Sequence, residues 1–175
     1  LWDDAKNIVL LDAVAPQVSW PVLVAGDATG PGGQRRELSS CQSLGAVPSA
    51  LLGGYMARAS VYAAPALYEP FGLAILEAAS AGCALLLGDI PSLRELWDGV
   101  AVFAPPRDQS AFARALRLLE GDPRGRRALA AAARQRACRF TSAAQADAYI
   151  ALARELAAER GASSVSLALG ATSCA

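Results

Sequence analysis

The sequence contains no histidine, a single lysine and few aromatic residues. Among its 175 residues the 16 basic side chains are Lys6 and 15 arginines, aromatic residues make up 6%, and the formal net charge is zero. The absence of histidine excludes Ser-His-Asp and Cys-His catalysis and most zinc sites. A net charge of zero provides no global field that would attract nucleic acid, so we expect no nucleic-acid partner.

Long hydrophobic runs and clustered cysteines are also lacking. The longest apolar stretch, residues 78–87, is too short to span a bilayer, and no N-terminal signal pattern is present. The four cysteines are too scattered for a metal motif and indicate structural thiols in a reduced compartment, so we expect a cytoplasmic protein. The first residue is Leu1 rather than methionine, and we expect the chain to begin inside a larger protein.

The centre of the chain reads as a strand, a loop, a helix and a second strand. Residues 60–64 are apolar and end at a proline, residues 73–81 are strong helix formers, and residues 83–87 are again apolar. This order predicts a parallel crossover unit. In such sheets ligands bind beyond the carboxyl ends of the strands, where the loop meets the helix N-terminus.

The loop at 69–72 carries the groups that such a ligand would need. Gly72 permits close approach to the backbone, and the amides of Phe71, Gly72 and Leu73 would point at an anion. Glu69 in the loop and Glu77 in the helix could accept hydrogen bonds from hydroxyls. The segment therefore predicts a site for a ligand that combines phosphate with hydroxyls. The alternative is an ordinary parallel-sheet loop with two solvated glutamates.

The flanking segments complete an α/β pattern. Before the centre we expect a helix over 3–14, a strand over 21–27, a mobile loop over 28–37, a strand over 43–47 and a helix over 48–59. After it we expect a helix over 91–97, a strand over 100–103, and helices from 109 to 121, from 124 to 138 and from 142 to 159. The predicted organisation is a Rossmann-like domain over 1–140, a C-terminal helix over 141–160 and a disordered tail over 161–175.

The run Tyr68-Glu69-Pro70-Phe71-Gly72-Leu73-Ala74-Ile75-Leu76-Glu77-Ala78 resembles the Glu-x7-Glu signature of retaining, nucleotide-sugar-dependent glycosyltransferases (group 1, family 4-like). Gly82-Cys83, Gly88-Asp89-Ile90-Pro91 and Arg94-Glu95 follow the same pattern downstream, while Ala66 departs from it where serine is common. Members have two facing Rossmann-like domains, the GT-B fold. The resemblance implies an α/β, doubly wound parallel sheet that forms the C-terminal, donor-binding half of such a fold.

The resemblance also implies roles for individual residues. Lys6 would hold the donor diphosphate and offset charge on the leaving group, and Glu77 would accept both ribose hydroxyls. Glu69 would position the transferred sugar ring, with the loop amides binding phosphate. Val47, at the end of its strand, would contact the nucleotide base through its backbone. The alternatives are a solvated lysine at position 6 and simple core packing for Val47.

The function implied is transfer of a sugar from a nucleoside-diphosphate sugar to an acceptor, which could be a glycan, a lipid or a small molecule. In the resembled family a first strand and an N-terminal acceptor-binding domain would lie outside this chain, so we expect it to be inactive alone. No Asp-x-Asp occurs, and we expect no metal requirement and no further cofactor. Two alternatives are a nucleotide-sugar epimerase of the same architecture and a non-catalytic nucleotide-binding module.

Residues 107–139 hold nine arginines against three acidic residues. One interpretation is peripheral contact with anionic lipid head groups. The other is a solvated helical face, which is the usual explanation of a charge run.

Overall fold

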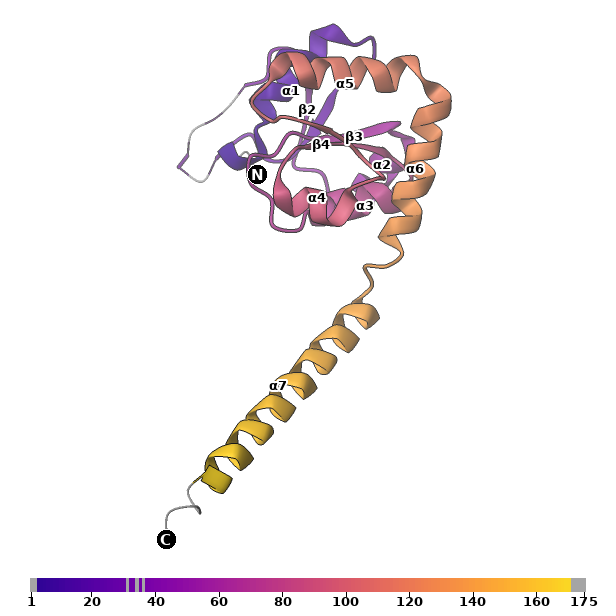
Figure 1. The fold of residues 1–175 in the computed structure, drawn as a ribbon. Coiled ribbons are helices and arrows are strands. Elements are labelled where there is room, and N and C mark those ends of the chain that lie inside the picture. The colour runs from indigo at the N-terminus through magenta and orange to yellow at the C-terminus, as the bar shows by residue number, and fades with distance from the viewer. Residues whose placement is uncertain (1–2, 31, 34, 36, 171–175) are drawn as a thin grey trace. The chain divides into compact units, whose positions relative to one another are not determined.

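The computed structural model describes residues 3–170 apart from 31, 34 and 36, and for residues 159–170 it describes the backbone only. The chain divides into two compact units, with the boundary between Cys138 and Arg139. The first unit holds every described strand, and the second is built on one long helix (Figure 1).

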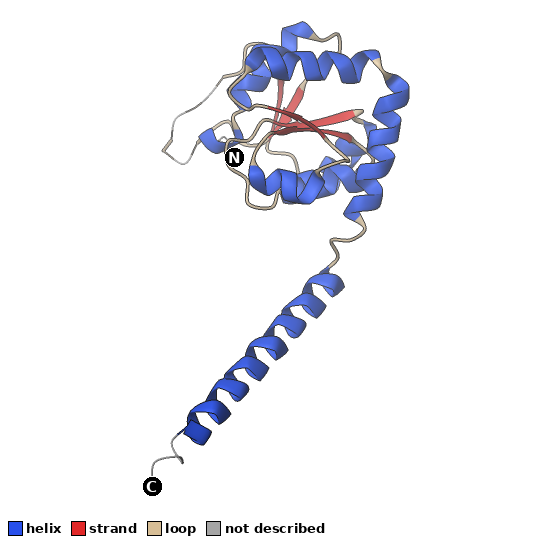
Figure 2. Ribbon diagram, in the orientation of Figure 1, coloured by secondary structure: helices blue, strands red, loops and turns tan. Residues whose placement is uncertain are grey.

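The described strands of the first unit form two parallel sheets (Figure 2). The strands are β1 (Leu23–Ala25), β2 (Gln42–Gly45), β3 (Val61–Ala64), β4 (Ala84–Gly88) and β5 (Val102–Ala104). One sheet pairs β1 with β2, and the other has the order β3-β4-β5. Helices cover both faces, with α1 and α5 on one side and α2, α3 and α4 on the other (Figure 1). The predicted doubly wound α/β class is confirmed.

The helices of this unit follow the predicted positions closely. Their bounds are α1 (Ile8–Val14), α2 (Ser49–Arg58), α3 (Leu73–Ala81), α4 (Pro91–Trp97), α5 (Gln109–Gly121) and α6 (Pro123–Ala137), with 3-10 turns η1 (Asp4–Lys6) and η2 (Ala15–Gln17). The break between α5 and α6 occurs at Asp122, whose side chain accepts a hydrogen bond from the Gly125 amide at 2.9 Å. A side-chain oxygen at this position satisfies one of the unpaired amides of the new helix.

The core is centred on β4, where every residue is buried. A strand covered on both faces needs apolar side chains in succession, which the run Leu85-Leu86-Leu87 supplies. Trp97 of α4 and Phe112 of α5 are among the largest fully buried side chains. Gly88 is the last residue of β4. A Cβ at this position would lie 2.5 Å from the Ala66 carbonyl oxygen, so only glycine lets the strand pass close to the loop after β3.

The N-terminal helix expected over 3–14 is interrupted, so this prediction was wrong in detail. The η1 turn comes first, Asn7 then adopts a left-handed conformation with φ 54°, and α1 begins only at Ile8. The Asn7 side-chain amide donates to the carbonyls of Pro65 and Pro106, at 3.0 and 2.7 Å. These long-range bonds hold Asn7 in a conformation that Asn tolerates better than most residues.

The expected loop over 28–37 carries an isolated antiparallel bridge between Thr29 and Arg35. Its positions 31, 34 and 36 lie outside the described residues. The strands on either side, β1 and β2, are both shorter than predicted.

The second unit contains α7, which runs from Ser142 to Gly170. The Thr141 hydroxyl accepts a hydrogen bond from the Ala144 amide at 3.1 Å, as expected of a helix cap. The helix continues ten residues past the predicted end, so residues 161–170 differ from the disordered tail expected there. The segment contains no proline, and its backbone can stay helical without apolar periodicity. Residues 171–175 of that tail lie outside the described residues.

Candidate functional site

The loop between β3 and α3 ends at Gly72, the N-cap of α3. Gly72 is buried with φ 80°, and a Cβ there would lie 2.7 Å from Ile75 Cδ1, so both conformation and space require glycine. The Gly72 carbonyl accepts from the amides of Ile75 and Leu76 at 2.9 and 3.0 Å. Gly72 has no side chain, so α3 has no side-chain cap at its N-cap position, where an anion could take that place.

Lys6 reaches this loop and forms an ion pair with Glu69, 63 residues further along the chain. The Lys6 side chain is 43% exposed and that of Glu69 is 15% exposed, so the carboxylate is the more enclosed partner. The backbone brings the two together, because the Leu67 amide donates to the Ala5 carbonyl at 2.8 Å. The structure thus brings together two of the residues predicted to act on the donor.

Two further residues that sequence reasoning missed hold this arrangement. Ser92 of α4 donates its hydroxyl to the Glu69 carbonyl at 2.6 Å. Asn7, next to Lys6, binds the carbonyls of Pro65 and Pro106, in the loops that follow β3 and β5. Neither residue belongs to a local motif, so their roles follow only from contacts between segments distant in the sequence. Both fix the backbone around Glu69 and Lys6.

Glu77 lies exposed on α3, where it is the fifth residue of the helix, just past the first turn. Burial, with smaller contributions from the negative charges of Glu69 and Glu77, raises the pKa of Tyr62 on β3 to about 12. Sequence reasoning did not identify Tyr62, which reads simply as an aromatic strand residue.

Val47 lies on a different loop from Glu69. It is partly buried in the loop between β2 and α2, two residues after the strand ends. This is the carboxyl end of a parallel strand, as is the loop that carries Glu69. The predicted backbone contact of Val47 with a base stays a prediction.

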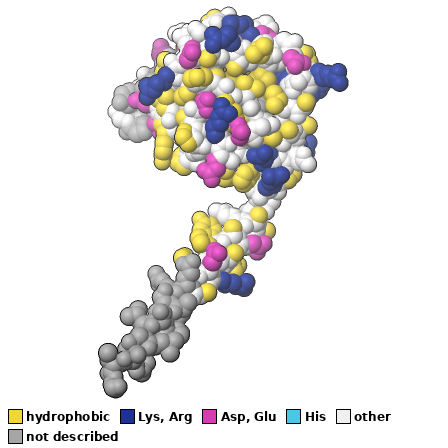
Figure 3. All heavy atoms as spheres, viewed as in Figure 1, with side chains coloured by type: hydrophobic (Ala, Val, Ile, Leu, Met, Phe, Trp, Pro, Cys, Tyr) yellow, Lys and Arg dark blue, Asp and Glu magenta, His cyan; other side chains and the backbone are white. Residues whose placement is uncertain are grey.

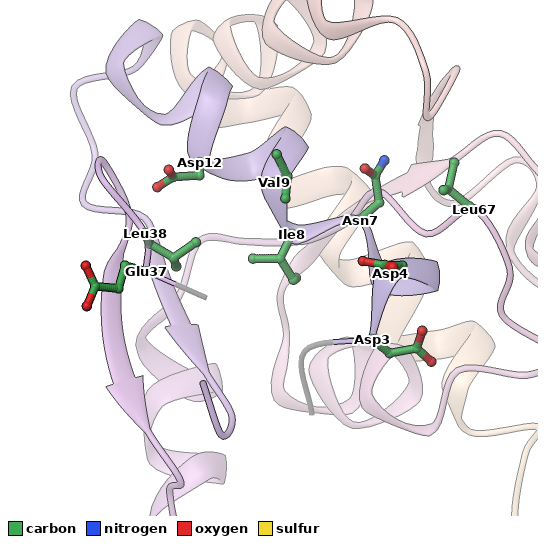
Figure 4. A pocket seen from close by; sticks show the side chains of 9 residues that line it. All are labelled: Asp3, Asp4, Asn7, Ile8, Val9, Asp12, Glu37, Leu38 and Leu67. Atoms are coloured by element: carbon green, nitrogen blue, oxygen red, sulfur yellow. The ribbon is translucent and has the colours of Figure 1, made fainter. Parts of the chain in front are cut away.

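The described residues also form a hollow of about 540 Å³ beside the η1 turn (Figure 4). It is lined by Asp3, Asp4, Asn7, Ile8, Val9, Asp12, Glu37, Leu38 and Leu67. Neither Glu69, Glu77 nor the start of α3 lines it. Four carboxylates disfavour an anionic ligand, so this hollow is a poor candidate for a diphosphate.

Asp12 in this hollow has a structural function. Its carboxylate accepts hydrogen bonds from the amides of Ser39, Ser40 and Cys41, at 2.9, 2.8 and 2.8 Å. Burial opposes ionisation, but these amides outweigh it and hold the pKa of Asp12 below its ordinary value. Asp12 therefore anchors the segment that leads into β2.

Several arginines have partners within the domain. Arg94 of α4 pairs with Asp89 and Asp98 at 2.7–2.9 Å and stacks 4.3 Å from the Phe103 ring centroid. In the arginine-rich region 107–139, Arg126 donates to backbone carbonyls and stacks on Trp20, and Arg136 donates to the Leu96 carbonyl at 2.8 Å. On the face seen in Figure 3, Lys and Arg side chains are scattered rather than gathered in one continuous patch. Lipid contact stays a prediction.

Within the described residues no group of three or more Asp, Glu, Cys or His side chains is arranged to hold a metal ion. No helix among them is long and apolar enough to cross a membrane.

Together, the parallel α/β fold and the loop at the start of α3 define a Rossmann-like domain of the GT-B glycosyltransferases. The model of the family "Glycosyl transferases group 1" matches residues 2–122. The chain therefore belongs to this family.

Individual relatives agree with this assignment. The chain is 36% identical over 105 residues to glycogen synthase of Mycobacterium tuberculosis, a match that covers 59% of this chain and 25% of the relative. Sucrose-phosphate synthase from Thermosynechococcus elongatus is 25% identical in a superposition with a TM-score of 0.75, covering 90% of this chain and 44% of that one. HepE from Anabaena, solved with UDP-glucose, superposes with a TM-score of 0.72 at 18% identity. This match covers 87% of this chain and 46% of HepE. The chain thus spans less than half the length of these proteins.

Proposed function

We propose that this chain is the donor-binding half of a retaining glycosyltransferase, which transfers a sugar from a nucleoside-diphosphate sugar to an acceptor. The observation that carries the proposal is the ion pair between Lys6 and Glu69, which lies three residues before Gly72, the N-cap of α3. A cation and a helix N-terminus suit a diphosphate, and a neighbouring carboxylate suits sugar hydroxyls. HepE, which shares the fold, was solved with UDP and with UDP-glucose, so uridine nucleotides are the first ligands to test.

Each site residue has a separate part in the proposal. Lys6 and the amides of Phe71, Gly72 and Leu73 bind the diphosphate. Glu77 accepts the ribose hydroxyls with its two carboxylate oxygens. The backbone at Val47, in the loop after β2, contacts the base.

Glu69 serves the transferred sugar. As the bond to the leaving phosphate breaks, the ring gains oxocarbenium character, and a fixed carboxylate favours that positive charge. Lys6 favours the negative charge that builds on the leaving diphosphate. The chain's own groups supply this stabilisation, so the proposal includes neither a metal ion nor a further cofactor.

The acceptor, whether a glycan, a lipid or a small molecule, would bind mainly to a facing N-terminal domain. The chain alone then holds one substrate and leaves the other unpositioned, so we propose that it is inactive by itself. Free thiols at Cys41, Cys83 and Cys138 support a reduced, cytoplasmic location, with peripheral membrane contact through the arginine-rich helices as a further proposal. The family match does not favour an epimerase or a non-catalytic module.

Calorimetric titration of the purified chain with UDP-glucose, GDP-glucose and ADP-glucose tests the proposal. We expect saturable binding of at least one of them, weakened about tenfold in a Lys6→Met variant and unchanged in an Arg58→Met variant. Arg58 is an exposed cation at the end of α2 and serves as the matched control. Equal loss of binding in both variants, or no binding to any of the three by the folded parent chain, would contradict the proposed site.

A further inference from the structure

The cation and the carboxylate that would hold different parts of a donor form an ion pair with each other. Lys6 pairs with Glu69, so the ammonium that would meet a diphosphate is already occupied by an anion of the protein. Resting on the proposed function, we propose that Glu69 is an internal competitor for Lys6, which weakens binding of the nucleoside diphosphate product relative to the sugar donor. Glu69 is then a specificity-determining residue as well as a sugar-binding one.

The surrounding structure holds Glu69 ready for this competition. The Ser92 hydroxyl fixes the Glu69 carbonyl at 2.6 Å, and the Leu67 amide holds the loop to the η1 turn at 2.8 Å. Because the backbone on both sides is fixed, little conformational freedom is lost when the ion pair forms. An incoming phosphate must therefore displace a preorganised partner of Lys6 rather than water.

The unequal exposure of the two side chains makes displacement depend on the ligand. Lys6, 43% exposed, can turn toward a phosphate, whereas Glu69, 15% exposed, stays in the loop with its charge partly removed from water. A partly buried carboxylate that loses its partner is destabilised unless another donor replaces it.

A sugar donor and a nucleoside diphosphate differ in whether they can replace Lys6 as the hydrogen-bond donor to Glu69. Hydroxyls of the sugar can donate to Glu69 after Lys6 has turned away, so a nucleotide sugar compensates both members of the ion pair. A nucleoside diphosphate compensates only Lys6. Re-formation of the ion pair after transfer would then favour release of the diphosphate product.

The test compares UDP and UDP-glucose in calorimetric titrations of the parent chain and of Glu69→Gln. The amide keeps the size of the side chain but removes its charge. Because partly exposed ion pairs contribute up to about fivefold to an equilibrium constant, UDP should bind roughly 2- to 5-fold more tightly to the variant, and the preference for UDP-glucose over UDP should fall. Glu95→Gln, an exposed carboxylate on α4, should change neither value. Unchanged or weaker UDP binding by Glu69→Gln would overturn the inference.

A double substitution separates competition from a structural effect of position 69. In a Lys6→Met background there is no cation to compete for, so Glu69→Gln should no longer tighten UDP binding. A gain that persists without Lys6 would contradict the inference. Circular dichroism of each variant verifies the fold, and Glu69→Ala provides a second removal of the charge if the glutamine variant does not fold.

The ion pair can also be followed without a nucleotide. Lys6 is the sole lysine of the sequence, so selective ¹⁵N-lysine labelling gives one side-chain ammonium signal. Glu69→Gln should shift that signal and Glu95→Gln should not. If no nucleotide sugar binds the parent chain, the proposed function fails. Titration of the parent chain and of Glu69→Gln with inorganic pyrophosphate then still tests whether Glu69 competes with a phosphate for Lys6. Tighter pyrophosphate binding by Glu69→Gln supports it, and equal binding overturns it.

Discussion

Replacing Glu77 with alanine separates nucleotide binding from protein stability. Glu77 is exposed on α3, and alanine has the higher helix propensity, so we expect the free energy of unfolding to change by no more than about 0.5 kcal/mol. If its carboxylate accepts both ribose hydroxyls, the hydrogen bonds lost involve a charged group and contribute about 1.5–3 kcal/mol. At about 1.4 kcal/mol per decade, affinity for UDP should fall roughly 10- to 100-fold.

Calorimetric titration with UDP measures this loss, and thermal unfolding of the same samples measures stability. Glu95→Ala is the matched control, because Glu95 is also an exposed helical glutamate, on α4. A deoxynucleotide offers a second comparison: 2′-deoxy-UDP should already bind the parent chain weakly, and Glu77→Ala should weaken it less. Full affinity of Glu77→Ala for UDP would refute the ribose assignment.

Three further predictions concern the loop, the cation and acid stability. Gly72→Ala should destabilise the domain by about 1–3 kcal/mol in urea unfolding, because φ is 80° and the added Cβ meets Ile75; an unchanged midpoint would contradict the geometry. Lys6→Met should weaken UDP binding about tenfold in calorimetry, and equal affinity would remove Lys6 from the site. Burial opposes ionisation of Asp12, but three amide hydrogen bonds outweigh it and lower the pKa of Asp12 from its ordinary value of 3.8. Ionised Asp12 therefore stabilises the fold at pH values above 3.8, and this stabilisation is lost as the pH falls through the lowered pKa. In Asp12→Asn the melting temperature should therefore fall less steeply at acid pH than in the parent chain. The same pH dependence in both proteins would show that Asp12 does not stabilise the fold in this way.

The central crossover unit could be predicted from the sequence because its signals are local. Gly72 and Gly82 bound a run of strong helix formers, and α3 occupies residues 73–81 as expected. The apolar run after Gly82 became the fully buried β4. Each of these elements depends on residues within a few positions of one another, so a single sequence carries the information.

The N-terminal turn shows why other features could not be predicted. The acidic residues before Lys6 favour a helix, and the local pattern gives no reason to end it at Asn7. The conformation of Asn7 instead depends on Pro65 and Pro106, which lie 58 and 99 residues away. The same holds for the Lys6–Glu69 ion pair and for Ser92. Sequence reasoning proposed both charged residues, but it assigned them to separate parts of a ligand rather than to each other.

The length of the C-terminal helix could not be predicted for another reason. Past residue 160 the sequence loses its apolar spacing, which predicts disorder, yet the backbone continues as helix to Gly170. Apolar periodicity reports burial against a partner, so its loss past residue 160 does not by itself decide whether the backbone is helical.

The position of the nucleotide sugar in the domain tests the central claim most directly. Amide chemical-shift mapping of the isotope-labelled chain with UDP-glucose compares two regions, the start of α3 and the acidic hollow beside η1. We predict that the amide signals of Gly72 and Leu73 move in a saturable manner while those of Glu37 and Leu38 do not. Saturable shifts confined to Glu37 and Leu38 would contradict the account, because the donor would then bind in the hollow that the site residues do not line.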